Sequence, residues 1–235
     1  AWGGVAGVLR ARLGLSEIIT TIMLNFVAFW LVSYLVRGPL QDPDGAGYPY
    51  TREVEPQVQL GLVGDVLPVG AILMILVGVA AWVLMDRSLT GVHIKALGAG
   101  EPASRFAGIS VARITTFSLA VAAALGGLAG AVSLLGNQHR LSDFFSPNWG
   151  FDAVATALIG RGSPIGTLIA GIFIGFLRSG IQAAQGTAAV PVALAQIMLG
   201  VVVLFLIIAN ADVVVRSIQR LRLRLWGGGA RERVA

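Results

Sequence analysis

Apolar blocks of about twenty residues recur along this 235-residue chain, and they limit the folds that it can adopt. A helix of this length crosses the hydrocarbon core of a bilayer, which is roughly 30 Å thick. The chain is 56% hydrophobic and 12% charged, and this charged share is about half that of a soluble domain. The sequence therefore predicts an all-α fold, a polytopic transmembrane helical bundle.

About six membrane crossings are predicted. Five apolar blocks have the usual length and cover residues 17–36, 66–85, 114–136, 165–183 and 190–211. Residues 150–162 are also apolar, but as a helix they reach only about 20 Å, less than the apolar core. This short element is either a broken helix inside the bundle, beside a translocation pathway, or an ordinary tilted helix.

The distribution of cations sets the orientation. Most of the 17 Lys and Arg residues lie before the first span, in residues 86–113 and in the tail 212–235. If the short element crosses the membrane, all three regions fall on one side, which the positive-inside rule identifies as the cytoplasm. We expect a multi-pass protein with both visible ends cytoplasmic. We also expect one transmembrane domain over residues 1–235, truncated at its N-terminus because the chain does not begin with Met.

Several functions are disfavoured by the sequence. The chain has no Cys, and its two His residues, His93 and His139, fall on opposite sides of the predicted membrane, so no metal site is expected. No catalytic residues are predicted, because no HExxH motif or paired nucleophile and base is present. The placement of the cations argues against nucleic acid as a partner. A proton- or sodium-coupled secondary transporter stays as the alternative, although no Asp, Glu or His lies near the centre of a span.

Residues 86–113 are too polar to cross the membrane. Glu101 and Pro102 are typical of a helix start, and Gly108 is typical of a helix end, so a helix of about two turns is predicted over 102–107. This segment is either a plain cytoplasmic connector or a rigid helix that transmits force to a docked partner.

The run ALGAGEPASRFAGISVAR within this segment resembles the coupling segment of the branched-chain amino acid/ribose-type ABC permease family. The runs GLSEIITTIMLNFVAFWLVSYLVRGPLQDP, ALGGLAGAV and GFDAVATALIGRGSPIG resemble other signatures of that family, the first of its nucleoside and simple-sugar branch. The resemblance implies that the ATPase-coupling residues are Ala96, Leu97, Gly98, Ala99, Gly100, Glu101, Pro102, Ala103, Arg105, Ala107 and Gly108.

The resemblance also implies a role and partners. The chain would be the permease subunit of a bacterial ABC importer in the plasma membrane, paired with a second permease subunit, most simply as a heterodimer. An ABC ATPase would supply energy, with ATP and Mg bound there, and an extracytoplasmic binding protein or lipoprotein would deliver the solute. No GxxxxGK[ST] phosphate loop is present, so this chain is expected to bind no cofactor and to have no enzyme activity. Nucleosides are the first expected solute, then simple sugars, then branched-chain amino acids.

Polar residues within the apolar blocks are candidates for the solute pathway. Thr20, Thr21 and Asn25 lie in the first span, and polar groups inside a span turn either to a neighbouring helix or to a solute cavity. Phe151 and Asp152 open the short element. Phe151 could stack on a base or sugar ring, and Asp152 could instead complement the helix dipole.

Small residues and cations suggest further roles at helix surfaces. Gly126 and Gly130, and likewise Gly171 and Gly175, have the spacing that lets two helix backbones pack closely in lipid. We expect Arg178 to extend to the outer interface and to have no other role. The basic tail fits binding to anionic membrane lipids, and equally it fits retention of topology by positive charge.

Overall fold

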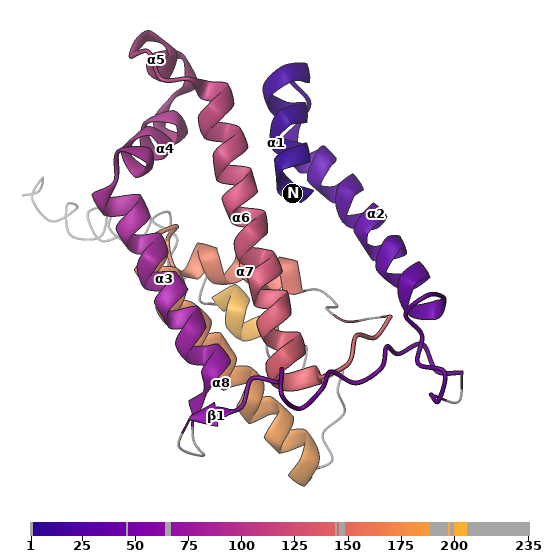
Figure 1. Cartoon of the computed structure of the whole chain (residues 1–235). Helices are drawn as coiled ribbons and strands as arrows, with labels where there is room; N and C mark the ends of the chain where they lie inside the picture. The colour runs from indigo at the N-terminus through magenta and orange to yellow at the C-terminus, as the bar shows by residue number, and fades with distance from the viewer. Residues whose placement is uncertain are drawn as a thin grey trace, which may run out of the picture. The chain divides into compact units, whose positions relative to one another are not determined.

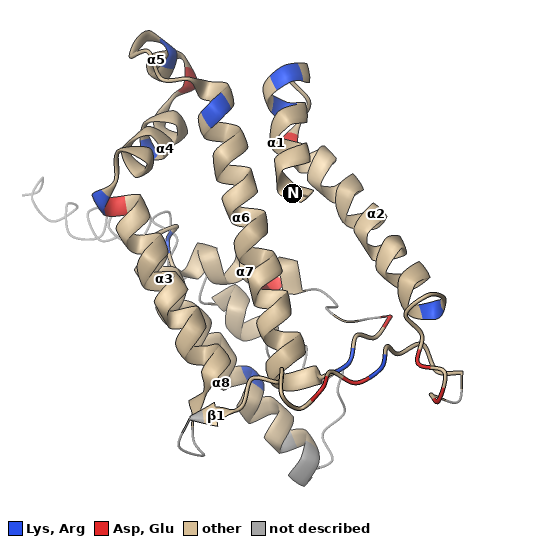
Figure 2. Cartoon of the chain, viewed as in Figure 1, with Lys and Arg blue, Asp and Glu red and all other residues tan. Residues whose placement is uncertain are grey.

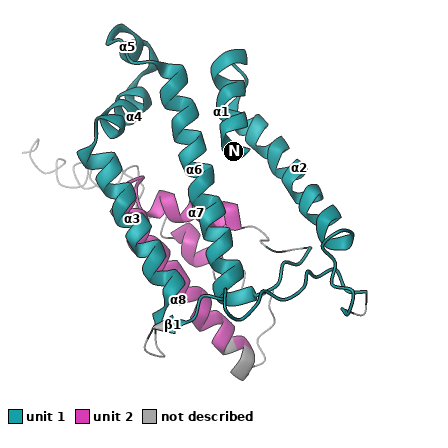
Figure 3. Cartoon of the chain, in the orientation of Figure 1, with its two compact units in different colours: residues 1–147 teal, residues 148–235 magenta. Residues whose placement is uncertain are grey.

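The computed structural model describes residues 2–45, 47–63, 67–143, 145, 149–188, 197 and 200–205. The chain divides into two compact units, Ala1–Pro147 and Asn148–Ala235, and each is described here by itself (Figure 3). Most of the described residues are helical (Figure 1).

The first unit carries α1 (Trp2–Leu13), α2 (Glu17–Arg37), α3 (Val69–Arg87), α4 (Leu89–Ala99), α5 (Glu101–Phe106), α6 (Val111–Ser133) and a π-helix (Leu134–Gln138). Two short strands, β1 (Leu62–Val63) and β2 (Leu67–Pro68), pair antiparallel just before α3. The second unit carries α7 (Trp149–Ile159) and α8 (Pro164–Ala188).

Within the part of the chain that the structure describes, four helical segments are long and apolar enough to cross a membrane: Glu17–Arg37, Val69–Arg87, Val111–Gln138 and Pro164–Ala183. The predicted polytopic helical fold is thus confirmed. The predicted short element is α7, whose 11 residues reach only about 16 Å, too little to cross the apolar core alone. The sixth predicted span, 190–211, lies largely outside the described residues, and the basic tail lies outside them entirely.

Two helices were not predicted from the sequence. The first, α1, contains Gly3, Gly4 and Gly7, which lower its intrinsic helix propensity. It forms because it packs closely along α6: a methyl group added at Gly3 would overlap Ala123, and one at Gly7 would lie 2.7 Å from the Cα of Thr116. The second, α4, lies in the polar segment after α3, where only the helix at 102–107 had been expected. Tertiary contacts therefore decide both elements.

Few side chains are buried. Among the described residues, Ala6, Val36, Ala170 and Ile174 are the buried apolar ones. The long helices instead present large apolar side chains on their outside, such as Trp30 on α2, which is 67% exposed. Such a surface is suited to lipid and to neighbouring membrane helices.

The segment between α2 and α3 is held against the chain that follows α6. The backbone N–H of Thr51 donates to the carbonyl of Leu141 at 3.0 Å, and that of Val54 donates to the carbonyl of His139 at 2.9 Å. The two loops at this end of the first unit are thus joined to each other.

Candidate coupling segment and solute pathway

A tight turn places α4 directly after α3. The Ser88 hydroxyl oxygen accepts a hydrogen bond from the N–H of Gly91 at 3.1 Å, which caps the start of α4. Gly91 is buried, and a Cβ at this position would lie 2.5 Å from the carbonyl oxygen of Leu84 and would overlap that of Met85. Glycine is therefore required for α4 to fold back this closely on the end of α3.

The helix predicted at 102–107 is present as α5, which begins at Glu101 and ends at Phe106. An ion pair of 2.7 Å joins Glu101 to Arg105 one turn later. Gly108 has a positive φ of 76°, so it ends the helix in the left-handed conformation that glycine adopts easily. The N–H of Ile109 then donates to the carbonyl of Ser104 at 3.0 Å.

The predicted coupling residues thus occupy a short helix–break–helix. Those from Ala96 to Ala99 end α4, Gly100 lies at the break, and Glu101, Pro102, Ala103 and Arg105 form α5, followed by Ala107 and Gly108. Figure 1 shows α5 at one end of the first unit, between α4 and the start of α6. Their predicted contact with an ATPase stays a prediction.

Exposed apolar side chains in this segment were missed in the sequence analysis. Phe106 is 94% exposed and Leu89 is 80% exposed, although both lie among charged residues outside the candidate spans. A large apolar side chain inside so polar a stretch is the sequence signal that would have found Phe106. It gives α5 an apolar knob of the kind that fills pockets at protein interfaces.

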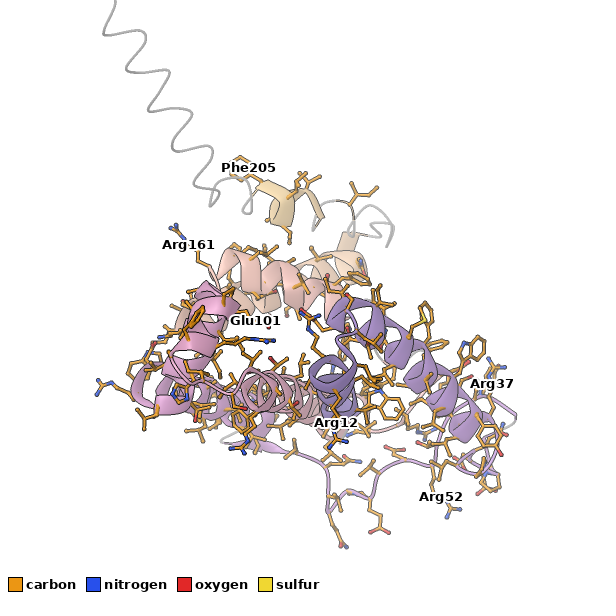
Figure 4. The ribbon with its side chains drawn as sticks, turned by 90° about the horizontal axis from the view of Figure 1, so that it is seen from above. Arg12, Arg37, Arg52, Glu101, Arg161 and Phe205 are labelled. Carbon is orange, nitrogen blue, oxygen red and sulfur yellow. The ribbon has the colours of Figure 1, made fainter. Side chains whose placement is uncertain are left out.

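A cleft of about 570 Å³ lies between this segment and the turn that joins α1 to α2. Arg10 and Glu17, which form an ion pair of 3.0 Å, line one side. Leu97, Glu101 and Arg105 line the other side. Figure 4 looks down on this end and labels Glu101. The cleft therefore separates α4 and α5 from the turn between α1 and α2.

The two ends of the first unit differ in charge (Figure 2). Among the described residues, the end that carries α5 holds Arg10, Arg12, Glu17, Asp86, Arg87, Lys95, Glu101, Arg105 and Arg113, with cations in excess. The opposite end holds Arg37, Asp42, Asp44, Arg52, Glu53, Glu55, Arg140 and Asp143, with acids in excess. This asymmetry is what the positive-inside rule describes.

At the acidic end, ion pairs fasten the loops. Arg37, the last residue of α2, donates from Nε to Asp143 at 3.0 Å, and Asp143 is buried. The hydrogen bonds from Arg37 and Ser33 hold the pKa of Asp143 below its usual range. A second pair of 2.8 Å joins Arg140 to Glu53, and the hydrogen bond from Arg140 likewise lowers the pKa of Glu53.

The predicted solute-pathway residues of the first span lie on α2. The hydroxyls of Thr20 and Thr21 donate to carbonyls one turn earlier, at 2.9 Å to Ser16 and 2.8 Å to Glu17. Their oxygens can still accept a hydrogen bond from another group. Asn25 is exposed. These three residues belong to the first unit, whereas Phe151 and Asp152 belong to the second.

In the second unit, Phe151 and Asp152 lie in the first turn of α7, and Phe151 is 79% exposed. Asp152 forms an ion pair with Arg178 of α8. The expectation that Arg178 simply extends to the interface is therefore wrong. A cation within a spanning helix is stabilised by a partner carboxylate, and α7 folds back far enough to provide one.

The predicted packing glycines have open surroundings. Among the described residues, nothing lies within 4 Å of a Cβ added at Gly126 or Gly175, while one at Gly130 would approach Phe145 at 3.9 Å and one at Gly171 would approach Thr156 at 3.8 Å. Close helix packing within the first unit occurs instead at Gly3 and Gly7. The role predicted for Gly126, Gly130, Gly171 and Gly175 stays a prediction, now for contact with a partner helix.

Comparison with known proteins identifies the family. The family model described as "Branched-chain amino acid transport system / permease component" matches residues 1–207. The chain belongs to this family. Its α4–α5 segment and spanning helices are thus those of an ABC permease component, and the resemblance inferred from the sequence is confirmed.

Permeases for sugars and nucleosides are among the similar members of this family. The glucose ABC transporter permease protein TsgB13 of Haloferax volcanii is 33% identical over 88% of the chain and 57% of its own length. The guanosine ABC transporter permease protein NupP of Bacillus subtilis is 29% identical over 87% of the chain and 60% of its own length. The nucleoside ABC transporter permease protein NupB of Lactococcus lactis is 32% identical over 76% of the chain and 52% of its own length. The chain thus spans just over half of each relative's length. No solved structure matches it.

Proposed function

We propose that this family member is the membrane-spanning permease subunit of an ABC importer that moves a small, neutral, polar solute into a bacterial cell. The observation that carries the proposal is the α4–α5 segment, a rigid helix–break–helix that lies outside the candidate spans and presents Phe106. An ABC ATPase, with its ATP and Mg, would bind this segment and supply the energy. A second permease subunit and an extracytoplasmic binding protein would complete the importer.

The charge of the two ends supports an orientation. The cationic end with α5 would face the cytoplasm, where the ATPase is, and the acidic loop end would face outward, where the binding protein delivers solute. Both visible ends of the chain would then be cytoplasmic, in a plasma membrane. The basic tail would contact anionic lipids there.

The transmission of force follows from the contacts of α5. Nucleotide-driven movement of the ATPase would displace Phe106 and α5, and Gly108 connects α5 to α6 through a short turn. Because α6 packs closely on α1 at Gly7, a tilt of α6 would carry the α1–α2 pair with it. The cleft beside Glu101 gives α4 and α5 room for this movement.

Nucleosides are the first proposed solute and simple sugars the second. Similar permeases for guanosine, nucleosides and glucose support both classes of solute. Hydroxyl and amide groups such as Thr21 and Asn25 suit solutes that need hydrogen bonds rather than charge. The secondary-transporter alternative requires solute movement without an ATPase, and the same experiment tests it.

The test is solute-stimulated ATP hydrolysis by the subunit reconstituted with its ATPase, second permease and binding protein. Phe106→Ala should lower the stimulated rate by about tenfold or more, because truncation of a central interface anchor costs about 2 kcal/mol or more. Phe117→Ala on α6, a half-exposed phenylalanine outside the coupling segment, is the matched control. Equal rates in both variants would remove the coupling role from α5. Solute uptake that needs no ATPase would favour the secondary transporter.

A further inference from the structure

The cleft between α5 and the α1–α2 turn lies where two candidate spans begin. Its lining includes Glu17, the first residue of the span Glu17–Arg37, and Val111, the first residue of the span Val111–Gln138. The ends of a spanning helix meet the polar headgroup region of a bilayer. The cleft therefore lies at headgroup depth, and its volume of about 570 Å³ is in the range of sites for small ligands.

Two ion pairs lie on opposite walls of this cleft. On the wall formed by the α1–α2 turn, Nε of Arg10 donates to Glu17 at 3.0 Å. On the α5 wall, Arg105 pairs at 2.7 Å with Glu101, which Figure 4 labels. Among the described residues, the charged lining thus consists of two guanidinium groups and two carboxylates, with no net charge.

These charged groups are placed to bind a ligand. All four side chains are more than a third exposed, and ion pairs of this kind contribute little stability, so a ligand can exchange for them without leaving a buried charge. A guanidinium group carries five N–H donors, and Arg105 donates to Glu101 through Nη2. Arg10 is held in position because its Nη1 donates to the carbonyl of Leu15 at 3.3 Å.

The charges of the lining match a zwitterion. Guanidinium groups bind phosphate through paired N–H donors, and carboxylates accept hydrogen bonds from an ammonium group. Arg12 and Arg113 are exposed at the same end of the unit but do not belong to the described lining, so the cleft does not share the excess of cations found there. A ligand with net negative charge would meet the two carboxylates without a cation of its own.

The lining also indicates which kind of ammonium group fits. Quaternary ammonium groups are recognised by the faces of aromatic rings. Within the described part of the chain, no aromatic side chain lines the cleft. A primary ammonium group, which donates hydrogen bonds to carboxylates, is therefore the better match.

Apolar side chains suited to acyl chains lie beside the cleft. Ile18 and Ile22, one turn apart on α2, are both exposed and follow directly after Glu17. We propose that the cleft binds the headgroup of a membrane phospholipid of the phosphatidylethanolamine class. Its phosphate would accept hydrogen bonds from the two arginines, and its ammonium group would donate to the two carboxylates. This site goes beyond the proposed importer function and does not depend on it.

Lipid binding to the purified full-length subunit tests the proposal without an ATPase. The subunit would be delipidated in detergent and titrated with dioleoyl phosphatidylethanolamine, phosphatidylcholine or phosphatidylglycerol, and bound lipid would be counted by native mass spectrometry. We expect one phosphatidylethanolamine to bind about three- to tenfold more tightly than the other two lipids, the effect of one hydrogen bond to a charged group at a half-exposed site. Equal binding of all three lipids, or a preference for phosphatidylglycerol, would overturn the proposal.

A soluble headgroup distinguishes a lipid site from a site for a free zwitterion. Glycerophosphoethanolamine has the same charged groups but no acyl chains. At a concentration equal to that of the lipid, it should not displace bound phosphatidylethanolamine. Displacement at equal concentration would show that the cleft binds a soluble zwitterion and would overturn the assignment to a lipid.

Variants locate the bound lipid. Glu101→Gln should abolish the preference for phosphatidylethanolamine over phosphatidylglycerol, because it removes one carboxylate, whereas Arg105→Gln should weaken the binding of all three lipids by about three- to tenfold. Arg113→Gln, an exposed arginine at the same end but outside the described lining, is the matched control and should keep the preference.

A steric variant leaves the charges unchanged. Gly98 lines the cleft, and nothing described lies within 4 Å of a Cβ added there, so the side chain in Gly98→Leu can enter the cleft without a clash in α4. This variant should bind less phosphatidylethanolamine. An unchanged preference for phosphatidylethanolamine in both Glu101→Gln and Gly98→Leu would place the bound lipid elsewhere, and the proposal would be wrong.

Discussion

At the scale of single residues, the functional segment depends on glycines that allow close approach or a left-handed turn. Gly91 lets α4 fold back on the end of α3, and Gly108 ends α5. Together these two residues set the positions at which Phe106 and Glu101 are presented. Their role could not be separated from that of the other 29 glycines by sequence alone.

Gly91→Ala should therefore destabilise the α3–α4 turn. The added methyl group overlaps the Met85 carbonyl, and relief of that overlap requires the backbone to move, at a cost of about 1–3 kcal/mol. We expect a lower midpoint of thermal unfolding for the purified subunit. Gly98→Ala, on the same helix with nothing within 4 Å of the new Cβ among the described residues, should raise the midpoint or leave it unchanged. Equal effects of the two substitutions would show that Gly91 is not a contact-limited position.

At the scale of elements, a short helix gains stability from the neighbour on which it packs. An isolated helix of the length of α1 is marginal in water, and its glycines weaken it further. Its close contact with α6 at Gly3 and Gly7 supplies what its propensity lacks. The same reasoning applies to α7, which is 11 residues long and lies along α8.

Gly7→Ala should loosen α1 from α6, because the new methyl group would lie 2.7 Å from the Thr116 Cα. Faster amide hydrogen exchange in residues 2–13 would report the change. Gly4→Ala, where nothing described lies within 4 Å of the new Cβ, is the matched control and should slow exchange, since alanine favours helix. Unchanged exchange in Gly7→Ala would contradict the close packing.

The loops at the acidic end of the first unit should respond to acid. The pKa values of Asp143 and Glu53 are lowered by their arginine partners, so both ion pairs contribute full stability above the unfolded-state pKa of about 4. This contribution is lost as pH falls through the lowered folded-state values. Hydrogen exchange at Thr51 and Val54, corrected for the intrinsic pH effect, should be constant from pH 8 to about pH 5 and rise below about pH 4. Asp143→Asn should raise exchange already at pH 7, and an unchanged value there would contradict the anchoring role.

At the scale of the whole molecule, cations are in excess at one end of the first unit and acids are in excess at the other. Positive charge on the cytoplasmic side opposes translocation of the loops that carry it. The orientation predicted from cation counts along the sequence stays a prediction.

Thiol labelling in intact cells tests this orientation. An impermeant reagent should modify Arg52→Cys from outside, and it should modify Phe106→Cys only after the membrane is permeabilised. The subunit is produced without its ATPase, which would otherwise cover Phe106; in the subunit alone both side chains are strongly exposed, so only the membrane separates their accessibilities. Labelling of Phe106→Cys in intact cells would reverse the proposed topology.

The sequence by itself determined the membrane class, the positions of four long spans, the helix at α5 and the family, because each depends on local properties such as apolar length, capping residues and motif order. It did not determine α1 and α4, or the Asp152–Arg178 and Arg37–Asp143 ion pairs. The ion pairs join residues up to 106 positions apart in the sequence. The helices form because packing compensates for their weak helix propensity. Only tertiary structure decides them, because the free energy that stabilises them comes from a neighbour distant in the sequence.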